Sequence, residues 1–121
     1  MTDKVCVVVG GGKGMGAAIA REMKKRKYTL SLMSPSENCE LLADELEGIA
    51  YRGRAEDSSD TDNLIKFTME KFGRIDCLLI HVAGPPKGDL LEISEDDWRK
   101  ANEMILMPVI RLSKLITPIM Q

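Results

Sequence analysis

Short apolar runs alternate along the chain with longer segments in which apolar residues recur at helical spacing. The run at residues 4–9 is rich in valine, which is typical of a strand buried on both faces of a sheet. We expect four strands, at residues 4–9, 29–33, 50–52 and 77–81. We expect four helices, at residues 15–27, 36–47, 61–71 and 94–120.

Several residues favour these boundaries and indicate which helix faces are apolar. Ser94 is followed three positions later by an acid, which is the spacing of a capping box, and Gly48 stands where the second helix should end. Three apolar residues share one face of the first helix: Met15, Ile19 and Met23. The expected inward stripe of the third helix is Ile65, Thr68, Met69 and Phe72.

Strands that alternate with helices are typical of a parallel sheet covered on both faces. With right-handed crossovers, we expect a Rossmann-like, doubly wound α/β sheet with strand order 3-2-1-4. A chain of 121 residues is enough for one such domain, which we place at residues 1–121. Ligands bind such sheets beyond the carboxyl ends of the strands, here between the loops that follow residues 9 and 81.

Glycines occupy positions 10, 11, 12, 14 and 16, between the first strand and the first helix. Gly10 lets the chain turn off the strand, Gly14 lets the backbone approach a pyrophosphate, and Gly16 lets helix and strand pack closely. The helix N-terminus adds unpaired N–H groups and a positive dipole end. A dinucleotide-binding loop explains this pattern better than a flexible turn without a ligand. Its expected contacts are Gly10, Gly12, Lys13, Gly14, Met15 and Gly16.

Residues beside this loop bear on which nucleotide binds. A triphosphatase P-loop requires Ser or Thr after Gly-Lys, and Lys13 is followed by glycine, which excludes that interpretation. An NAD site usually has an acid at the end of the second strand, where this chain has Ser34. A serine would not repel a 2′-phosphate, and Lys13 could reach it, although it could also be a solvated lysine. We therefore favour NADP over NAD.

Composition narrows the partners and the compartment. The chain has 17 Lys and Arg against 19 Asp and Glu, a net charge of −2, which argues against nucleic acid and anionic membranes as partners. Its apolar runs are far shorter than the ~20 residues of a membrane span, and the N-terminus lacks a signal-peptide pattern. Cys6, Cys39 and Cys77 have no metal-ligand spacing, so we expect no metal site. We interpret them as small buried side chains in a cytoplasmic protein.

The glycine spacing Gly-x-x-x-Gly-x-Gly is followed in register by three further segments: Asp57-Ser58 after the third strand, residues 75–79, and residues 94–120 with Trp98. Over the whole chain this set resembles the N-terminal, nucleotide-binding part of the short-chain dehydrogenase/reductase family. Residues 84–88 resemble its 3-oxoacyl-carrier-protein reductase-like subgroup. The resemblance implies hydride transfer between a nicotinamide cofactor and a carbonyl or alcohol. It also implies that Asp57 and Ser58 hold the adenine edge.

The chain departs from the family pattern at three places. The family's Asn-Asn-Ala-Gly falls either on residues 80–83 or on His81, Val82, Ala83 and Gly84, which we place among the cofactor contacts. The helix position where the family has Asn is Ile105. The Tyr-x-x-x-Lys pair is absent, because the only tyrosines, Tyr28 and Tyr51, are followed four residues later by Leu and Ala. We therefore assign no catalytic residue.

Two residues near the expected site have alternative interpretations. His81, the only histidine, is either an acid–base group beside the nicotinamide or a strand-end residue that contacts the cofactor through its backbone. We favour the second, because no nucleophile or acid is placed to work with it. Asp57 is either an adenine contact or an acid at a helix N-terminus, and these roles are compatible.

The last helix is apolar all round at residues 104–110, so it should be covered on every side. One cover is the sheet, and the other is a partner subunit, expected to give a homo-oligomer, or further residues of the family fold. Pro108 should bend the helix near residues 104–107.

Two functions fit these features. The first is the cofactor-binding part of an NAD(P)-dependent oxidoreductase, inactive by itself. The second is a non-catalytic nucleotide-binding or subunit-pairing module.

Overall fold

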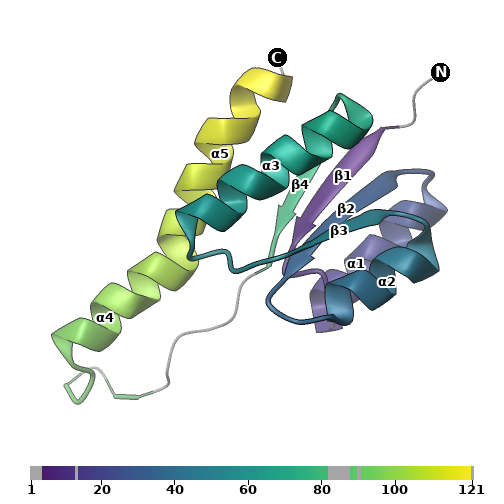
Figure 1. Ribbon diagram of the computed structural model, residues 1–121. Coiled ribbons are helices and arrows are strands. Elements are labelled where there is room, and N and C mark those ends of the chain that lie inside the picture. The colour runs from purple at the N-terminus through teal and green to yellow at the C-terminus, as the bar shows by residue number, and fades with distance from the viewer. Residues whose placement is uncertain (1–3, 13, 82–87, 90, 121) are drawn as a thin grey trace.

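The fold is an open parallel sheet with helices on both faces, shown as a computed structural model in Figure 1. The structure describes residues 4–12, 14–81, 88–89 and 91–120. The strands lie in the order β3-β2-β1-β4, and each neighbouring pair is parallel. They are β1 (Val5–Val9), β2 (Thr29–Ser34), β3 (Ile49–Arg52) and β4 (Cys77–Ile80). The fold class and the strand order predicted from the sequence are confirmed.

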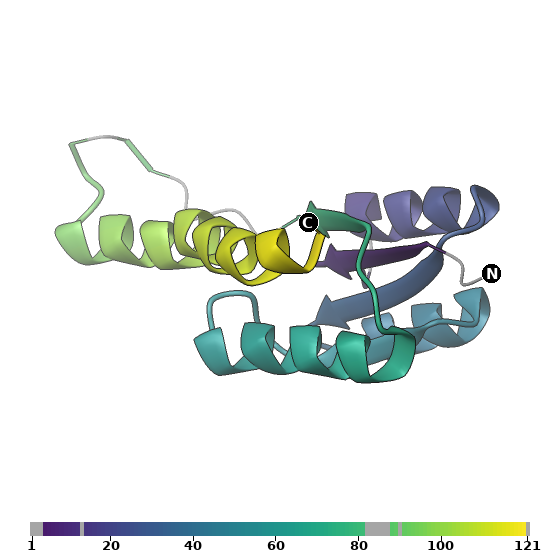
Figure 2. The same ribbon diagram turned by 90° about the horizontal axis from the view of Figure 1, so that it is seen from above.

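Helices α1 and α2 pack on one face of the sheet, and α3 and α5 pack on the other (Figure 1). The helical elements are α1 (Gly14–Lys25), α2 (Asn38–Leu46), α3 (Ser58–Phe72), α4 (Glu95–Ala101), the π-helical turn η1 (Asn102–Leu106) and α5 (Met107–Met120). Seen from above, α4 extends beyond the sheet (Figure 2). The part of the long helix that packs on the sheet is therefore α5.

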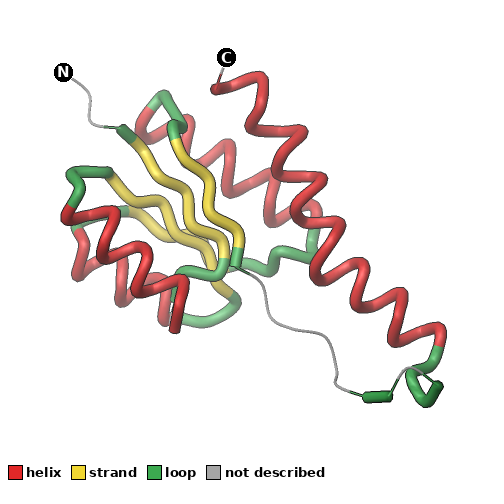
Figure 3. Tube along the Cα trace, turned by 180° about the vertical axis from the view of Figure 1, so that it is seen from behind, coloured by secondary structure: helices red, strands yellow, loops and turns green. Residues whose placement is uncertain are grey.

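Strand β1 lies at the centre of two hydrophobic cores. Each of its five residues is at most 1% exposed. Cys6 and Val8 face the core under α1 and α2, whereas Val7 and Val9 face the core under α3 and α5. Figure 3 shows the strands enclosed between the two helical layers. Burial on both faces explains why this strand is a continuous apolar run without polar alternation.

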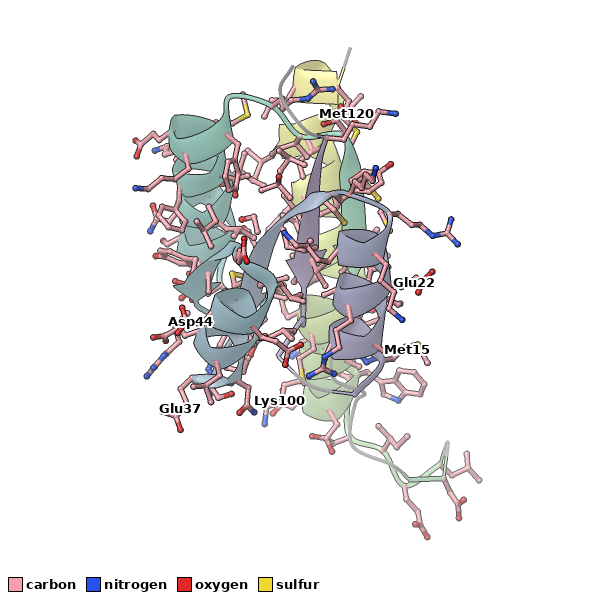
Figure 4. The ribbon with its side chains drawn as sticks, turned by 90° about the vertical axis from the view of Figure 1, so that its right-hand side faces the viewer. Met15, Glu22, Glu37, Asp44, Lys100 and Met120 are labelled. Carbon is pink, nitrogen blue, oxygen red and sulfur yellow. The ribbon has the colours of Figure 1, made fainter. Side chains whose placement is uncertain are left out.

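Helix α1 contacts the sheet through small residues. Gly16, Ala17 and Ala20 are its buried positions, whereas Met15 is 64% exposed and lies on the outer side of the helix (Figure 4). The apolar face predicted from residues 15, 19 and 23 is confirmed only in part: Met23 packs at the margin of the core and Ile19 is half-buried, whereas Met15 points outward. Small side chains let a helix approach a strand closely, so the contact face of α1 has little hydrophobic bulk.

The buried face of helix α3 agrees only in part with the predicted inward stripe. Its buried residues are Thr61, Leu64, Ile65 and Thr68. Met69 packs at the margin of the core, and Phe72 is only half-buried. Ile65 and Thr68 are buried as predicted, but the buried face begins one turn earlier than expected, at Thr61, because this buried residue is polar and its burial was not foreseen. The buried Oγ1 of Thr68 bonds to Ser31 Oγ at 2.7 Å and to the Leu64 carbonyl at 2.8 Å.

Helix α2 ends differently from the expectation at Gly48. Glu47 is the residue in the left-handed conformation, with φ of 57°, and the Gly48 N–H donates to the Ala43 carbonyl at 2.9 Å. Glycine is needed at position 48 for a different reason: a Cβ there would lie 2.4 Å from the Leu30 carbonyl oxygen. The glycine thus permits close contact with β2 instead of supplying the turn.

The long C-terminal helix begins and bends near the expected places. Ser94 Oγ accepts a hydrogen bond from the Asp97 N–H at 3.1 Å, as in a capping box. The bend expected at residues 104–107 is the π-helical turn η1, in which the Met107 N–H donates to the Asn102 carbonyl. Pro108 has no N–H to continue the α-helical pattern, and a π-turn accommodates that loss. Within the described residues, no helix has the length and apolar character needed to cross a membrane.

Candidate functional site

The glycine loop leaves β1 where the carboxyl ends of the strands meet. The N–H groups of Gly10 and Gly11 both donate to the Met33 carbonyl, at 2.8 and 3.2 Å, and the His81 N–H donates to the Val9 carbonyl at 2.8 Å. The loop is therefore bonded to the end of β2, while the end of β1 is bonded to the residue that follows β4. Figure 4 shows Met15, Glu37 and Lys100 at this end of the molecule and Met120 at the opposite end.

Two glycines of the loop are required by close approach of the backbone. A Cβ at Gly10 would lie 1.7 Å from the His81 carbonyl oxygen, and a Cβ at Gly16 would lie 2.1 Å from the Gly10 carbonyl oxygen. A Cβ at Gly14 would instead project into open space, with no atom within 4 Å. The first two glycines thus build the loop, whereas the third leaves a free approach to the first turn of α1.

A cavity of about 120 Å³ lies at the carboxyl ends of the strands. It is lined by Val9, Gly10, Met33, Ser34, Pro35, Gly53, Arg54, Ala55, Glu56, His81 and Met104. The lining combines the end of β1, the end of β2, the loop after β3 and the residue after β4. This is the place where an open α/β sheet binds ligands.

Ser34 lines this cavity and contacts the glycine loop, and its predicted contact with the nucleotide stays a prediction. It is 6% exposed, and its Oγ donates to the Ser36 carbonyl at 3.1 Å. A Cβ at Gly12 would lie 2.8 Å from that Oγ, so Gly12 and Ser34 are in contact. The Ser34 carbonyl also accepts the Gly53 N–H at 2.9 Å, which ties the end of β2 to the loop after β3.

The loop after β3 contributes residues that the sequence analysis missed. Arg54 and Glu56 line the cavity and form an ion pair of 3.5 Å, with 66% and 36% of their side chains exposed. Arg111 of α5 donates to the Glu56 carbonyl at 3.1 Å and to Glu103 at 3.0 Å, which anchors this loop to the long helix. The predicted strand order could have indicated these residues. Because β3 lies beside β2, the loop that follows β3 lies next to Ser34 at the end of β2.

Asp57 serves as the N-cap of α3. Its Oδ1 accepts the N–H groups of Ser59 and Asp60 at 2.8 and 3.2 Å. The interpretation of Asp57 as a helix N-terminal acid is therefore confirmed. Neither Asp57 nor Ser58 lines the cavity, where Arg54 and Glu56 stand instead, so their adenine contact stays a prediction.

His81 is exposed at the end of β4 and lines the cavity. Its backbone bonds to Val9 and closely approaches Gly10, and its contact with a cofactor stays a prediction. Among the described residues, no group of three or more His, Cys, Asp or Glu side chains is arranged to hold a metal. Four predicted contacts lie outside the described residues: Lys13, Val82, Ala83 and Gly84.

The comparisons agree with this geometry. Residues 4–121 match the family described as short chain dehydrogenase. The chain is 32% identical to meso-2,3-butanediol dehydrogenase of Serratia marcescens, over 96% of this chain and 48% of that protein. It is 27% identical to a 3-oxoacyl-[acyl-carrier-protein] reductase of Synechocystis sp., over 99% of this chain and 51% of that protein. The chain thus spans about half the length of these curated relatives.

A solved structure gives the same result in three dimensions. The KRED1-Pglu enzyme superposes with a TM-score of 0.89 and 31% sequence identity, over 97% of this chain and 51% of that one. The chain thus combines the glycine loop, the strand order and the cavity with a match to the family model over nearly its whole length. The chain belongs to the short-chain dehydrogenase family.

Proposed function

We propose that this chain is the dinucleotide-binding part of an oxidoreductase that moves hydride between NADP(H) and a carbonyl or alcohol substrate. The observation that carries the proposal is the cavity at the strand ends beside a loop in which a Cβ at Gly10 or Gly16 would collide with backbone. The open space at Gly14 and the first turn of α1 suit the pyrophosphate, and the cavity beside Ser34 suits the adenosine half. The cofactor supplies the hydride, and these residues bind and orient it.

The preference for NADP over NAD rests on the charges around Ser34. A hydroxyl stands at the end of β2, where an NAD site usually has a carboxylate. The acid that lines the cavity, Glu56, is paired with Arg54, so its charge is partly compensated. The largely exposed Arg54 guanidinium and Lys13 would favour a 2′-phosphate.

We propose that this chain alone binds the nucleotide without turnover. The chemistry of the family needs a Tyr and a Lys four residues later, and neither tyrosine here has that partner. Tyr51 accepts a hydrogen bond from Asn63 Nδ2 at 3.1 Å, and it is absent from the cavity lining.

A second candidate is a non-catalytic module that binds nucleotide and pairs with other subunits. The observation that favours it is an exposed apolar surface on the long helix, formed by Ile105, Leu106, Val109 and Ile110, which are 36–52% exposed. We propose that this surface joins copies of the chain, because large apolar side chains grouped on one helix are typical of an interface.

The test is titration of the purified chain with NADPH and NADH, followed by nicotinamide fluorescence, beside a carbonyl-reduction assay. The proposal expects saturable binding, tighter for NADPH, without turnover. Binding of neither nucleotide would overturn the cofactor assignment. Sedimentation of the wild type and of Ile110→Lys tests the pairing surface, since a charge there should shift an oligomer toward monomer.

A further inference from the structure

Two cysteines face each other on neighbouring strands, at the end of the sheet opposite the nucleotide cavity. Cys6 of β1 is in register with Cys77 of β4 in a parallel pair. Neighbouring strands lie about 4.8 Å apart, and a disulfide spans Cα separations of about 4.4–6.8 Å. The backbone spacing therefore permits a disulfide between these positions.

The two thiols lie on the same face of the sheet. Cys6 belongs to the core under α1 and α2, and Cys77 packs against that same core. Burial, together with the neighbouring Cys77, raises the pKa of the Cys6 thiol to about 12. The register and the shared face both place the two side chains next to each other.

The neighbouring residues fix this alignment. Asp76 and Val5 precede the two cysteines and are bonded in both directions: the Asp76 N–H donates to the Val5 carbonyl at 2.9 Å, and the Val5 N–H donates to Asp76 Oδ2 at 2.9 Å. Arg74 in turn holds the Asp76 carboxylate through Nε at 2.8 Å. The strands cannot slip here without breaking these bonds.

The two cysteines differ in access. Cys6 is 0% exposed, whereas Cys77 is only partly buried. A reagent in solution would therefore meet Cys77 first. Cys39, the third cysteine, is buried on α2, where its thiol donates to the Ser36 carbonyl at 3.4 Å.

We propose that Cys6 and Cys77 form a site of oxidative modification, at which a low-molecular-weight disulfide converts the two thiols into one intrachain disulfide. Cys77 loses its proton to water, and its sulfur attacks one sulfur of the oxidant. A mixed disulfide forms, the S–S bond of the oxidant breaks, and one small thiol leaves with a proton. The Cys6 thiol then loses its proton, and its sulfur attacks the Cys77 sulfur. The second small thiol is released, so that the oxidant gains the two electrons and two protons that the cysteines lose.

The closed disulfide would join the central strand to the outer strand at their amino ends. Because the cavity lies at the carboxyl ends, cross-linking should raise the melting temperature without blocking nucleotide binding. The proposal is therefore independent of the proposed function.

The experiment is treatment of the folded chain with oxidised glutathione, followed by non-reducing mass spectrometry and peptide mapping. The mass of the Cys39→Ser chain should fall by that of two hydrogen atoms. Peptide mapping should give one disulfide-linked pair of peptides, which contain residues 6 and 77. The double variant C6S/C39S should stop at a glutathione adduct on Cys77, and C39S/C77S should stay unmodified. Dithiothreitol should restore the free thiols of Cys39→Ser and of C6S/C39S.

A stable glutathione adduct on Cys77 of the Cys39→Ser chain would overturn the proposal, as would a disulfide that joins two chains or no reaction at all. Circular dichroism before treatment checks that each variant is folded. If a variant is not folded, the linked peptide from the wild-type chain decides the question, since mapping identifies the paired cysteines directly.

Discussion

Replacing Ser34 by Asp tests whether a 2′-phosphate binds at the end of β2. Ser34 is 6% exposed, contacts Gly12 and lines the cavity, so a carboxylate there would lie in the proposed nucleotide site. Both Asp and Asn remove the hydroxyl that donates to the Ser36 carbonyl. Ser34→Asn is therefore the matched control, because it has the shape of Asp without the charge.

The expected effect follows from the charges. Two unit charges about 5 Å apart repel by about 1 kcal/mol in water and by about 3 kcal/mol at the effective dielectric of a protein surface. Such a coupling weakens binding of NADPH by about 5- to 150-fold. NADH has no 2′-phosphate, and its ribose hydroxyl could donate to the new carboxylate, a bond that contributes about 1 kcal/mol.

The assay is fluorescence titration of wild-type, Ser34→Asn and Ser34→Asp chains with both nucleotides, at low and at high salt. Ser34→Asp should reverse the preference, so that NADH binds more tightly than NADPH. Ser34→Asn should weaken the binding of both nucleotides by the same factor. Salt should reduce the difference between the variants, because it screens exposed charges. Equal loss of NADPH affinity in both variants would refute the reasoning, since charge would then play no part.

Three further perturbations separate binding from stability. Gly14→Ala and Gly73→Ala both place a Cβ at positive φ in open space, so calorimetry should find each destabilised by about 1–2 kcal/mol, but only Gly14→Ala should lose nucleotide in the titration. Asp57→Ala should lower the free energy of unfolding by about 0.5–2 kcal/mol and Asp57→Ser by less, since Ser also caps helices; equal losses in urea titrations would contradict the capping role. The hydrogen bond from Arg74 holds the pKa of Asp76 below its ordinary value of 3.8, so its stabilising contribution is present above that value and is lost as the pH falls through the lower, folded-state pKa. Asp76→Asn should flatten this acid limb in unfolding curves between pH 5 and pH 2, and an unchanged slope would contradict the assignment.

The strands and their order could be predicted because each depends on a local pattern and a general rule. A valine-rich run between polar segments indicates a strand buried on both faces, and right-handed crossovers leave few possible orders. The contact face of α1 could not be predicted in this way. Hydrophobicity favoured Met15, whereas the buried face is formed by Gly16, Ala17 and Ala20, because the distance between helix and strand decides which side chains fit.

The candidate site divides along the same line. Contact between Gly12 and Ser34 was foreseeable, since both follow neighbouring strands. The positions of Arg54 and Glu56 in the cavity lining could not be foreseen. The start of α3 decides which residues of the loop after β3 reach the cavity. Asp57 caps that helix, and its bonds to the first turn fix the preceding residues toward the cavity.

The central part of this site is shaped by backbone atoms. Met33, Val9 and His81 contribute carbonyl or N–H groups to it, and two glycines are present because a Cβ would collide with neighbouring backbone. A site of this kind depends on a few glycine positions and on strand order more than on the side chains around it. This explains how the chain keeps the family's fold at 27–32% identity to its relatives. Ser34 and Arg54, in contrast, present side chains to the cavity. Differences in nucleotide preference should therefore arise from substitutions at these two positions, while the glycine loop stays unchanged.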